Sequence, residues 1–190
     1  MHTTTPPQIQ AFKHLSNFVD AHAALRTLLI VYYAGHGYRS ARDRDHIALS
    51  GKAFIELEDK FANSIEWHEV ERTLVSINSD VLVIFDCCQA GLLCSSAREG
   101  SVTDGRIFQY LGACESQQQT RSAGEHSFTS AVTWALKELI GETSFPVTKL
   151  VKKIESHAGF PHGKQRPVLF SGRFDPASAN ICLGCMSPQL

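Results

Sequence analysis

Two stretches of the chain are apolar at every position rather than at alternate ones. They are Leu28–Tyr33 and Val81–Phe85, short segments rich in β-branched and aromatic residues. Strands in the middle of a parallel sheet are covered on both faces, so continuous apolar runs of this length are typical of them. Each run ends abruptly, in Ala34-Gly-His-Gly37 after the first and Asp86-Cys-Cys-Gln-Ala-Gly91 after the second. The pattern predicts two central strands, each followed by a turn.

Other apolar residues recur at helical spacing, and further short runs have strand character. Strands that alternate with helices predict a three-layer α/β/α domain around a mainly parallel sheet. The expected helices contain Ile9, Phe12, Leu15, Phe18 and Val19; Trp67, Val70, Leu74 and Val75; the segment from Phe128 to Ile140, ended by Gly141; and a segment opened by Pro146 that includes Val151 and Ile154. The further strands are Ile107–Leu111, Val168–Phe170, Asn180–Leu183, and Ile47–Ser50 as one arm of a hairpin.

Composition narrows the class of protein. A length of 190 residues suits one domain, here 1–190, and 43% hydrophobic residues exclude a disordered chain. A formal charge of −1 gives no electrostatic basis for binding nucleic acid, and we expect no membrane partner either. Six cysteines without a secretory signal predict reduced thiols and a cytoplasmic location.

The segment 92–106 differs from its surroundings. It reads LLCSSAREGSVTDGR and is rich in serine, glycine and charge. We expect an exposed linker there, the part of the chain most sensitive to proteases.

The turns after the two central strands carry the candidate chemistry. In a parallel sheet both turns lie at the same edge, so we expect His36 and Cys88 to become neighbours. A deprotonated thiol is a strong nucleophile and an imidazole moves protons near neutral pH. Gly37 follows the histidine, and its amide together with that of Cys88 is the predicted oxyanion hole. No metal or other cofactor is expected, because Cys182-Leu-Gly-Cys185 lacks a second pair of ligands.

These motifs resemble those of caspase-like cysteine peptidases, peptidase family C14. Tyr32-Tyr-Ala-Gly-His-Gly37 resembles the histidine motif, and Asp86-Cys-Cys-Gln-Ala-Gly91 resembles the metacaspase motif Asp-x-Cys-x-x-Gly. Caspases carry a histidine about 50 residues before the cysteine, as this chain does. Gly112-Ala-Cys-Glu-Ser and Gly124-Glu-His-Ser-Phe-Thr129 are similar to fungal caspase-like domains. The resemblance implies a caspase-like fold and a cysteine endopeptidase that acts on proteins or peptides.

The resemblance also implies a role for several single residues. It makes Cys88 the nucleophile rather than Cys87, and it places Asp86 in a pocket for a basic P1 side chain, Arg or Lys. Capping of the helix that follows is the alternative role of Asp86. Arg98 and Arg106 lie where relatives have the junction between large and small subunits, and they are candidates for self-cleavage.

The chain departs from the family pattern at its beginning. Caspase-like folds start with a strand and a helix before the histidine strand, whereas about one helix precedes Leu28 here. We therefore expect the first strand or strands to be missing, so that the chain is truncated, the fold is reduced, or a second copy or another chain completes the sheet. The rival hypothesis is an inactive module for protein–protein assembly in cell-death or immune signalling. A third is a thiol redox protein that uses Cys87 with Cys88, or Cys182 with Cys185.

Overall fold

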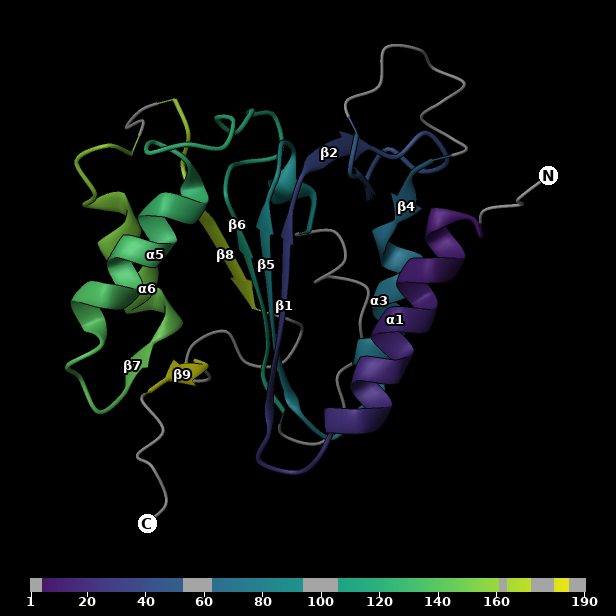
Figure 1. Cartoon of the computed structure of the whole chain (residues 1–190), viewed down its shortest axis with the longest axis horizontal. Coiled ribbons are helices and arrows are strands. Elements are labelled where there is room, and N and C mark those ends of the chain that lie inside the picture. The colour runs from purple at the N-terminus through teal and green to yellow at the C-terminus, as the bar shows by residue number, and fades with distance from the viewer. Residues whose placement is uncertain (1–4, 53–62, 94–105, 161–163, 172–179, 185–190) are drawn as a thin grey trace.

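The main sheet of the protein has four strands in the order β1-β5-β6-β8 (Figure 1). The structure, a computed structural model, describes residues 5–52, 63–93, 106–160, 164–171 and 180–184. Strands β1, β5 and β6 are parallel, and β8 pairs antiparallel with β6. The predicted mainly parallel sheet is thus confirmed, with strand bounds of Leu28–Ala34 (β1), Asp80–Asp86 (β5), Phe108–Gly112 (β6) and Val168–Ser171 (β8).

Helices cover both faces of this sheet. The helices α1 (Pro7–His22) and α3 (Trp67–Val75) pack against each other on one face. On the opposite face lie α5 (Phe128–Leu139) and α6 (Val147–Glu155) (Figure 1). The three-layer α/β/α architecture expected from the sequence is confirmed.

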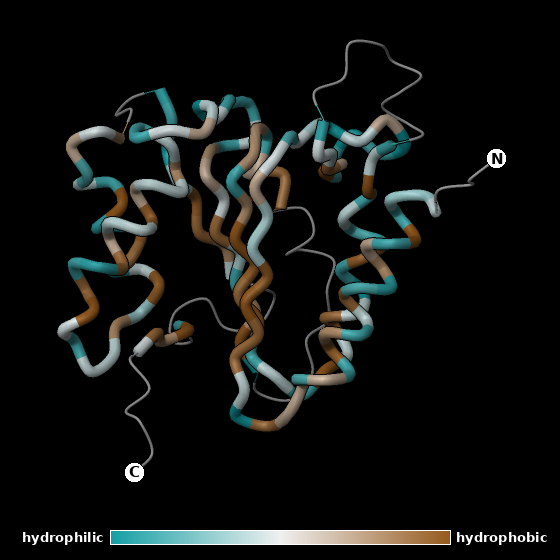
Figure 2. Tube along the Cα trace, in the orientation of Figure 1, coloured by the Kyte–Doolittle hydropathy of each residue, from teal (hydrophilic) through white to brown (hydrophobic). Residues whose placement is uncertain are grey.

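Strand β5 shows why the central strands are apolar throughout. Successive side chains of a strand point to opposite faces. Val81, Val83 and Phe85 therefore enter the core under α1 and α3, whereas Leu82 and Ile84 enter the core under α5 and α6. Figure 2 shows the resulting hydrophobic colour along the middle of the sheet. A polar residue on either face of β5 would lie in one of the two cores.

A second, smaller sheet follows β1 directly. It contains β2 (His36–Arg39), β3 (Ile47–Ser50) and β4 (Ile65–Glu66), all antiparallel. The hairpin expected around Ile47–Ser50 is confirmed. His36 is the first residue of β2, so one residue, Gly35, separates the two sheets at this point.

Two expected boundaries are corrected. Of Asn180–Leu183, only Cys182–Leu183 form a strand, β9, which pairs with β7 (Phe145–Pro146) outside the main sheet. The Ile181 amide donates to the Gln109 side chain at 3.1 Å instead of to a strand neighbour. The expected exposed linker does not begin at residue 92, because Leu92 and Leu93 are apolar and buried in the core under α1 and α3. Residues 94–105 of that linker lie outside the described residues.

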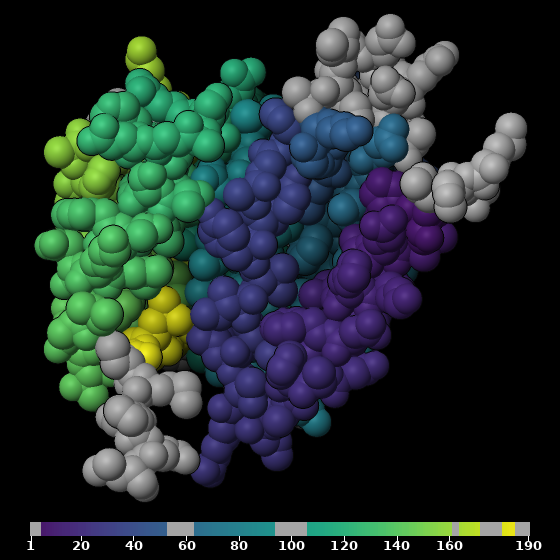
Figure 3. Space-filling view, in the orientation of Figure 1, coloured from purple at the N-terminus to yellow at the C-terminus, as the bar shows by residue number. Residues whose placement is uncertain are grey.

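Strand β1 forms an edge of the main sheet in the described part of the chain. Its side chains Ile30 and Tyr32 are 46% and 45% exposed, high values for large apolar groups. Figure 3 shows β1 on the surface between α1 and α5. Among the described residues, no helix is long and apolar enough to cross a membrane.

Candidate active site

The segments that carry His36 and Cys88 lie in contact at the carboxyl edge of the sheet. In the parallel register Ala34 lies opposite Asp86, and the Gly35 amide donates to the Asp86 carbonyl oxygen at 3.2 Å. A Cβ atom added at Gly37 would lie 2.1 Å from the Cys88 carbonyl oxygen. Glycine is therefore required at position 37 to let the two backbones approach.

The backbone of His36 is fixed while its side chain faces solvent. The Tyr33 hydroxyl donates to the carbonyl oxygens of both His36 and Ser50, at 3.0 and 2.8 Å. Tyr33 itself packs on Phe85 of β5, and burial raises the pKa of its hydroxyl. The His36 ring is exposed and stacks on Tyr38, with 6.3 Å between ring centroids.

The two adjacent cysteines have different environments. Cys87 is 0% exposed and belongs to the core under α1 and α3. Burial, followed by the nearby Cys114, Cys88 and Asp86, raises the pKa of the Cys87 thiol well above its ordinary value. Cys88 is only half-buried. Cys88 is therefore the better placed of the two to act as a nucleophile.

The same difference disfavours a redox role for the Cys87–Cys88 pair, because one of the two thiols is inaccessible. Cys114 is also buried, and burial raises the pKa of its thiol to about 11. Cys182 is exposed, whereas Cys185 lies outside the described residues, as Cys94 does.

Thr120 is a close neighbour of Cys88 that the sequence did not reveal. Its backbone amide donates to the Cys88 sulfur at 3.4 Å, and its hydroxyl lies 3.7 Å from the same atom. Thr120 belongs to the connection between β6 and α5, 32 positions after Cys88. The segment Gly112-Ala-Cys-Glu-Ser, already singled out by resemblance, marks the beginning of this connection. Nothing in the sequence signals the contact itself.

Asp86 is bound to the first turn of α5. One of its carboxylate oxygens accepts from the Thr129 amide at 3.0 Å and from the Thr129 hydroxyl at 2.5 Å. The same hydroxyl forms a short hydrogen bond with Tyr32. Burial raises the pKa of Asp86, and the bonds from Thr129 oppose that rise. Asp86 therefore does not cap the 3-10 helix that follows Cys88. It accepts from an amide in the first turn of α5, whose N-cap is Ser127.

Gln89 gives the turn after Cys88 its shape. Its φ is positive, 63°, and it precedes a short 3-10 helix, Ala90–Leu92. A Cβ atom at Gly91 would lie 2.3 Å from the Ser116 backbone nitrogen, so glycine is needed there for close packing.

Of the two candidates for self-cleavage, the structure describes only Arg106. Arg98 lies outside the described residues. Arg106 is half-buried, and its guanidinium donates to the Val75 carbonyl oxygen at 3.4 Å. In the described parts of the chain, no cluster of three or more His, Cys, Asp or Glu side chains could hold a metal ion.

Comparisons with known proteins agree with this architecture. The family model for Peptidase_C14, described as the caspase domain, matches residues 6–177. No curated protein matches the chain significantly. The crystal structure of protein GSU0716 from Geobacter sulfurreducens is similar, with a TM-score of 0.60 and 15% identity over 90% of this chain and 76% of that one. At this identity the similarity concerns the fold alone.

The contact between Gly37 and Cys88 generates a prediction. We expect Gly37→Ala to lower the free energy of unfolding by about 2 kcal/mol, because the new methyl group would overlap the Cys88 backbone. Urea denaturation measures this change. Gly51→Ala is the matched control at the end of β3, since a Cβ atom there meets nothing within 4 Å. Equal midpoints for the two variants would contradict the close approach.

Proposed function

Because the chain belongs to the caspase-domain family of C14 peptidases, we propose that it is a cysteine endopeptidase with Cys88 as nucleophile and His36 as its acid–base partner. One observation carries the proposal: the backbone next to His36 touches that of Cys88 at the carboxyl edge of the sheet. The half-buried Cys88 thiol beside the fully buried Cys87 gives further support.

The proposed reaction proceeds through a thioester. The Cys88 thiolate attacks the carbonyl carbon of the scissile bond, and the electron pair of the double bond moves to the oxygen. His36 then protonates the leaving amine as the carbon–nitrogen bond breaks. In the second half, His36 removes a proton from water, the water attacks the thioester, and the Cys88 sulfur leaves.

The Gly37 and Cys88 amides are the proposed donors to the oxyanion. The close approach of the two backbones supports this, because it brings the segments that carry the two amides together. A donor of this kind is usually worth about 10²–10³ in rate. Neither amide depends on a side chain, so substitutions at position 88 would leave the backbone donor in place.

Asp86 is the proposed determinant of a basic P1 side chain, as in metacaspases. It lies two residues before Cys88, and its carboxylate is half-buried and held in one orientation by Thr129. An oriented carboxylate can bind an arginine or lysine with charge-assisted hydrogen bonds.

We therefore expect the protein to hydrolyse fluorogenic peptides with Arg at P1 faster than matched peptides with Asp at P1. Cys88→Ala and His36→Ala should abolish turnover. Asp86→Asn should remove the preference for Arg yet leave the fold intact, because the amide oxygen can still accept from Thr129 and a buried charge is lost.

Faster cleavage of the Asp-P1 peptides would keep the dyad but eliminate the basic pocket. Turnover that survives in Cys88→Ala would eliminate the dyad itself.

Self-cleavage provides a separate prediction. The bond after Arg106 is anchored, because the Ile107 amide donates to the Asp80 carboxylate at 2.7 Å. Of the two candidates we therefore expect cleavage after Arg98, absent in Cys88→Ala. Intact-mass measurement of active protein locates the cut, and a cut after Arg106 or after neither arginine would contradict the prediction.

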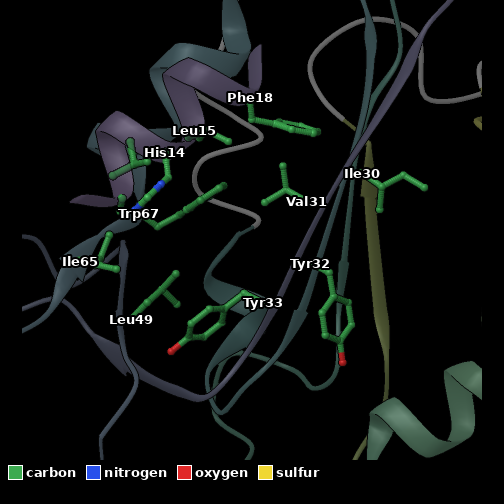
Figure 4. Close-up of a pocket in the computed structure, with 12 residues that line it drawn as sticks. His14, Leu15, Phe18, Ile30, Val31, Tyr32, Tyr33, Leu49, Ile65 and Trp67 are labelled. Atoms are coloured by element: carbon green, nitrogen blue, oxygen red, sulfur yellow. The ribbon is translucent and has the colours of Figure 1, made fainter. Parts of the chain in front are cut away.

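The exposed edge of the sheet favours a second candidate function, an inactive module for assembly. A strand can pair antiparallel with its own copy, and with Val31 at the centre Ile30 of each copy would lie opposite Tyr32 of the other. The two exposed large apolar side chains of β1 would thereby cover each other. Apolar grooves of about 620 and 340 Å³ flank the strand. In Figure 4, Val31 points toward Phe18 and Trp67, and Tyr33 lies on the same side of the strand, near Leu49.

If the chain assembles in this way, a concentration-dependent dimer should appear in analytical ultracentrifugation. Ile30→Lys should dissociate it, because a charge would enter the paired edge. Leu25→Lys is the control, since Leu25 is 79% exposed and lies outside β1. A wild-type protein that is monomeric at every concentration, or equal dimerisation of both variants, would rule out pairing through β1.

A further inference from the structure

The connection between β6 and α5 holds a donor against the candidate nucleophile. Over residues 113–121, hereafter the 113–121 loop, the chain passes over the 3-10 helix that follows Cys88. Gly91 allows this passage, because any side chain there would collide with the backbone of Glu115 and Ser116. The loop then presents the Thr120 amide to the Cys88 sulfur at 3.4 Å.

The loop is also tied to the backbone beside the nucleophile. The amide of Gln89, the residue after Cys88, donates to the Gln118 carbonyl oxygen at 3.2 Å. The Cys114 thiol donates to the same oxygen at 3.4 Å. The position of the loop and the turn after Cys88 are therefore set together.

The side chain of Gln118 fixes the shape of the loop. Its oxygen accepts from the Glu115 amide at 3.3 Å, within the loop, and from the Arg166 amide at 3.0 Å. Arg166 lies two residues before β8, so this one oxygen joins the loop to the strand that borders β6.

Gln165, the residue before Arg166, forms hydrogen bonds with both ends of the 113–121 loop. Its side chain is 3% exposed. Its nitrogen donates to the Ala113 carbonyl oxygen at 3.0 Å, and its oxygen accepts from the Arg121 amide at 3.3 Å. A buried side-chain amide with both its polar atoms bonded is costly to replace, because a lost partner leaves a polar group unsatisfied.

We propose that Thr120 is a further residue of the nucleophile site, whose backbone amide stabilises the Cys88 thiolate, and that Gln118 and Gln165 are positioning residues that hold it there. Hydrogen bonds donated to a charged form favour that form, and the thiolate is the reactive species. The inference rests on the proposed function only in taking Cys88 as the nucleophile.

Alkylation by iodoacetamide tests this without any peptidase activity. The rate at Cys88 is followed at pH 7 by mass spectrometry of the peptide that contains it. Gln118→Ala should lower this rate about tenfold, because the loop would no longer be held by the Glu115 and Arg166 amides. Gln118→Glu should restore it to within about twofold of the wild-type rate, since a carboxylate oxygen accepts the same two bonds. Gln119→Ala is the matched control at an exposed neighbouring position.

Two results would overturn the proposal: a Gln118→Ala rate equal to or above that of the wild type, or a Gln118→Glu rate as low as that of Gln118→Ala. If thermal unfolding shows that Gln118→Ala does not fold, Gln118→Asn replaces it, because its shorter side chain cannot span both amides. Slower alkylation in the variant, in a protein that hydrolyses neither peptide, would support the loop's role and count against the peptidase. Peptide turnover by the wild type, with an unchanged alkylation rate in the variant, would support the peptidase and count against the loop's role.

Discussion

The parallel pairing of β1 with β5 is the constraint on which the candidate site depends. It places Ala34 opposite Asp86, so the residues that follow both strands must leave the sheet at the same height. After β1 a single residue precedes the second sheet. After β5 the chain makes a left-handed turn at Gln89. Both are possible only because Gly37 lets the two backbones touch. The site therefore lies where the buried strand β5 pairs with β1, the strand at the edge of the sheet in the described part of the chain.

The sequence predicted what depends on local pattern. Continuous apolar runs identified β1 and β5 as strands, and helical spacing identified α5 and α6. A strand end followed by small residues identified Cys88 as a candidate. The expectation that both strands are central is confirmed for β5 but not for β1, which lies at the edge of the sheet in the described part of the chain. The features that the sequence did not predict are contacts between distant segments. The bond from Asp86 to Thr129 crosses 43 positions, and that from Thr120 to Cys88 crosses 32. Neither has a periodic signal, and Gly91 carries no mark that distinguishes a tight contact from a turn.

The Asp86 carboxylate at the end of β5 can bind α5 and also serve the proposed substrate site, because the two roles do not exclude each other. Asp86 fixes the start of α5 through Thr129, which orders the helix against the sheet. The same bonds fix the orientation of its carboxylate, although burial raises its pKa and so makes the charge costly. A carboxylate that merely capped a helix could sit in solvent at no such cost. The proposed binding of a basic P1 side chain would compensate for this cost, because a positive group would then face the carboxylate.

The candidate site combines parts of the chain on both sides of the segment 94–105. Cys88 and Gln89 precede that segment, whereas the 113–121 loop and the Gln165–Arg166 pair follow it. The contacts between the two groups are hydrogen bonds and close packing, and the sheet joins them again through β5 and β6. A cut between them would therefore leave these contacts in place, because none depends on the covalent connection. The sheet and the 113–121 loop would then both connect the nucleophile segment to the part of the chain that contains β8, the loop through the bond between the Gln118 side chain and the Arg166 amide.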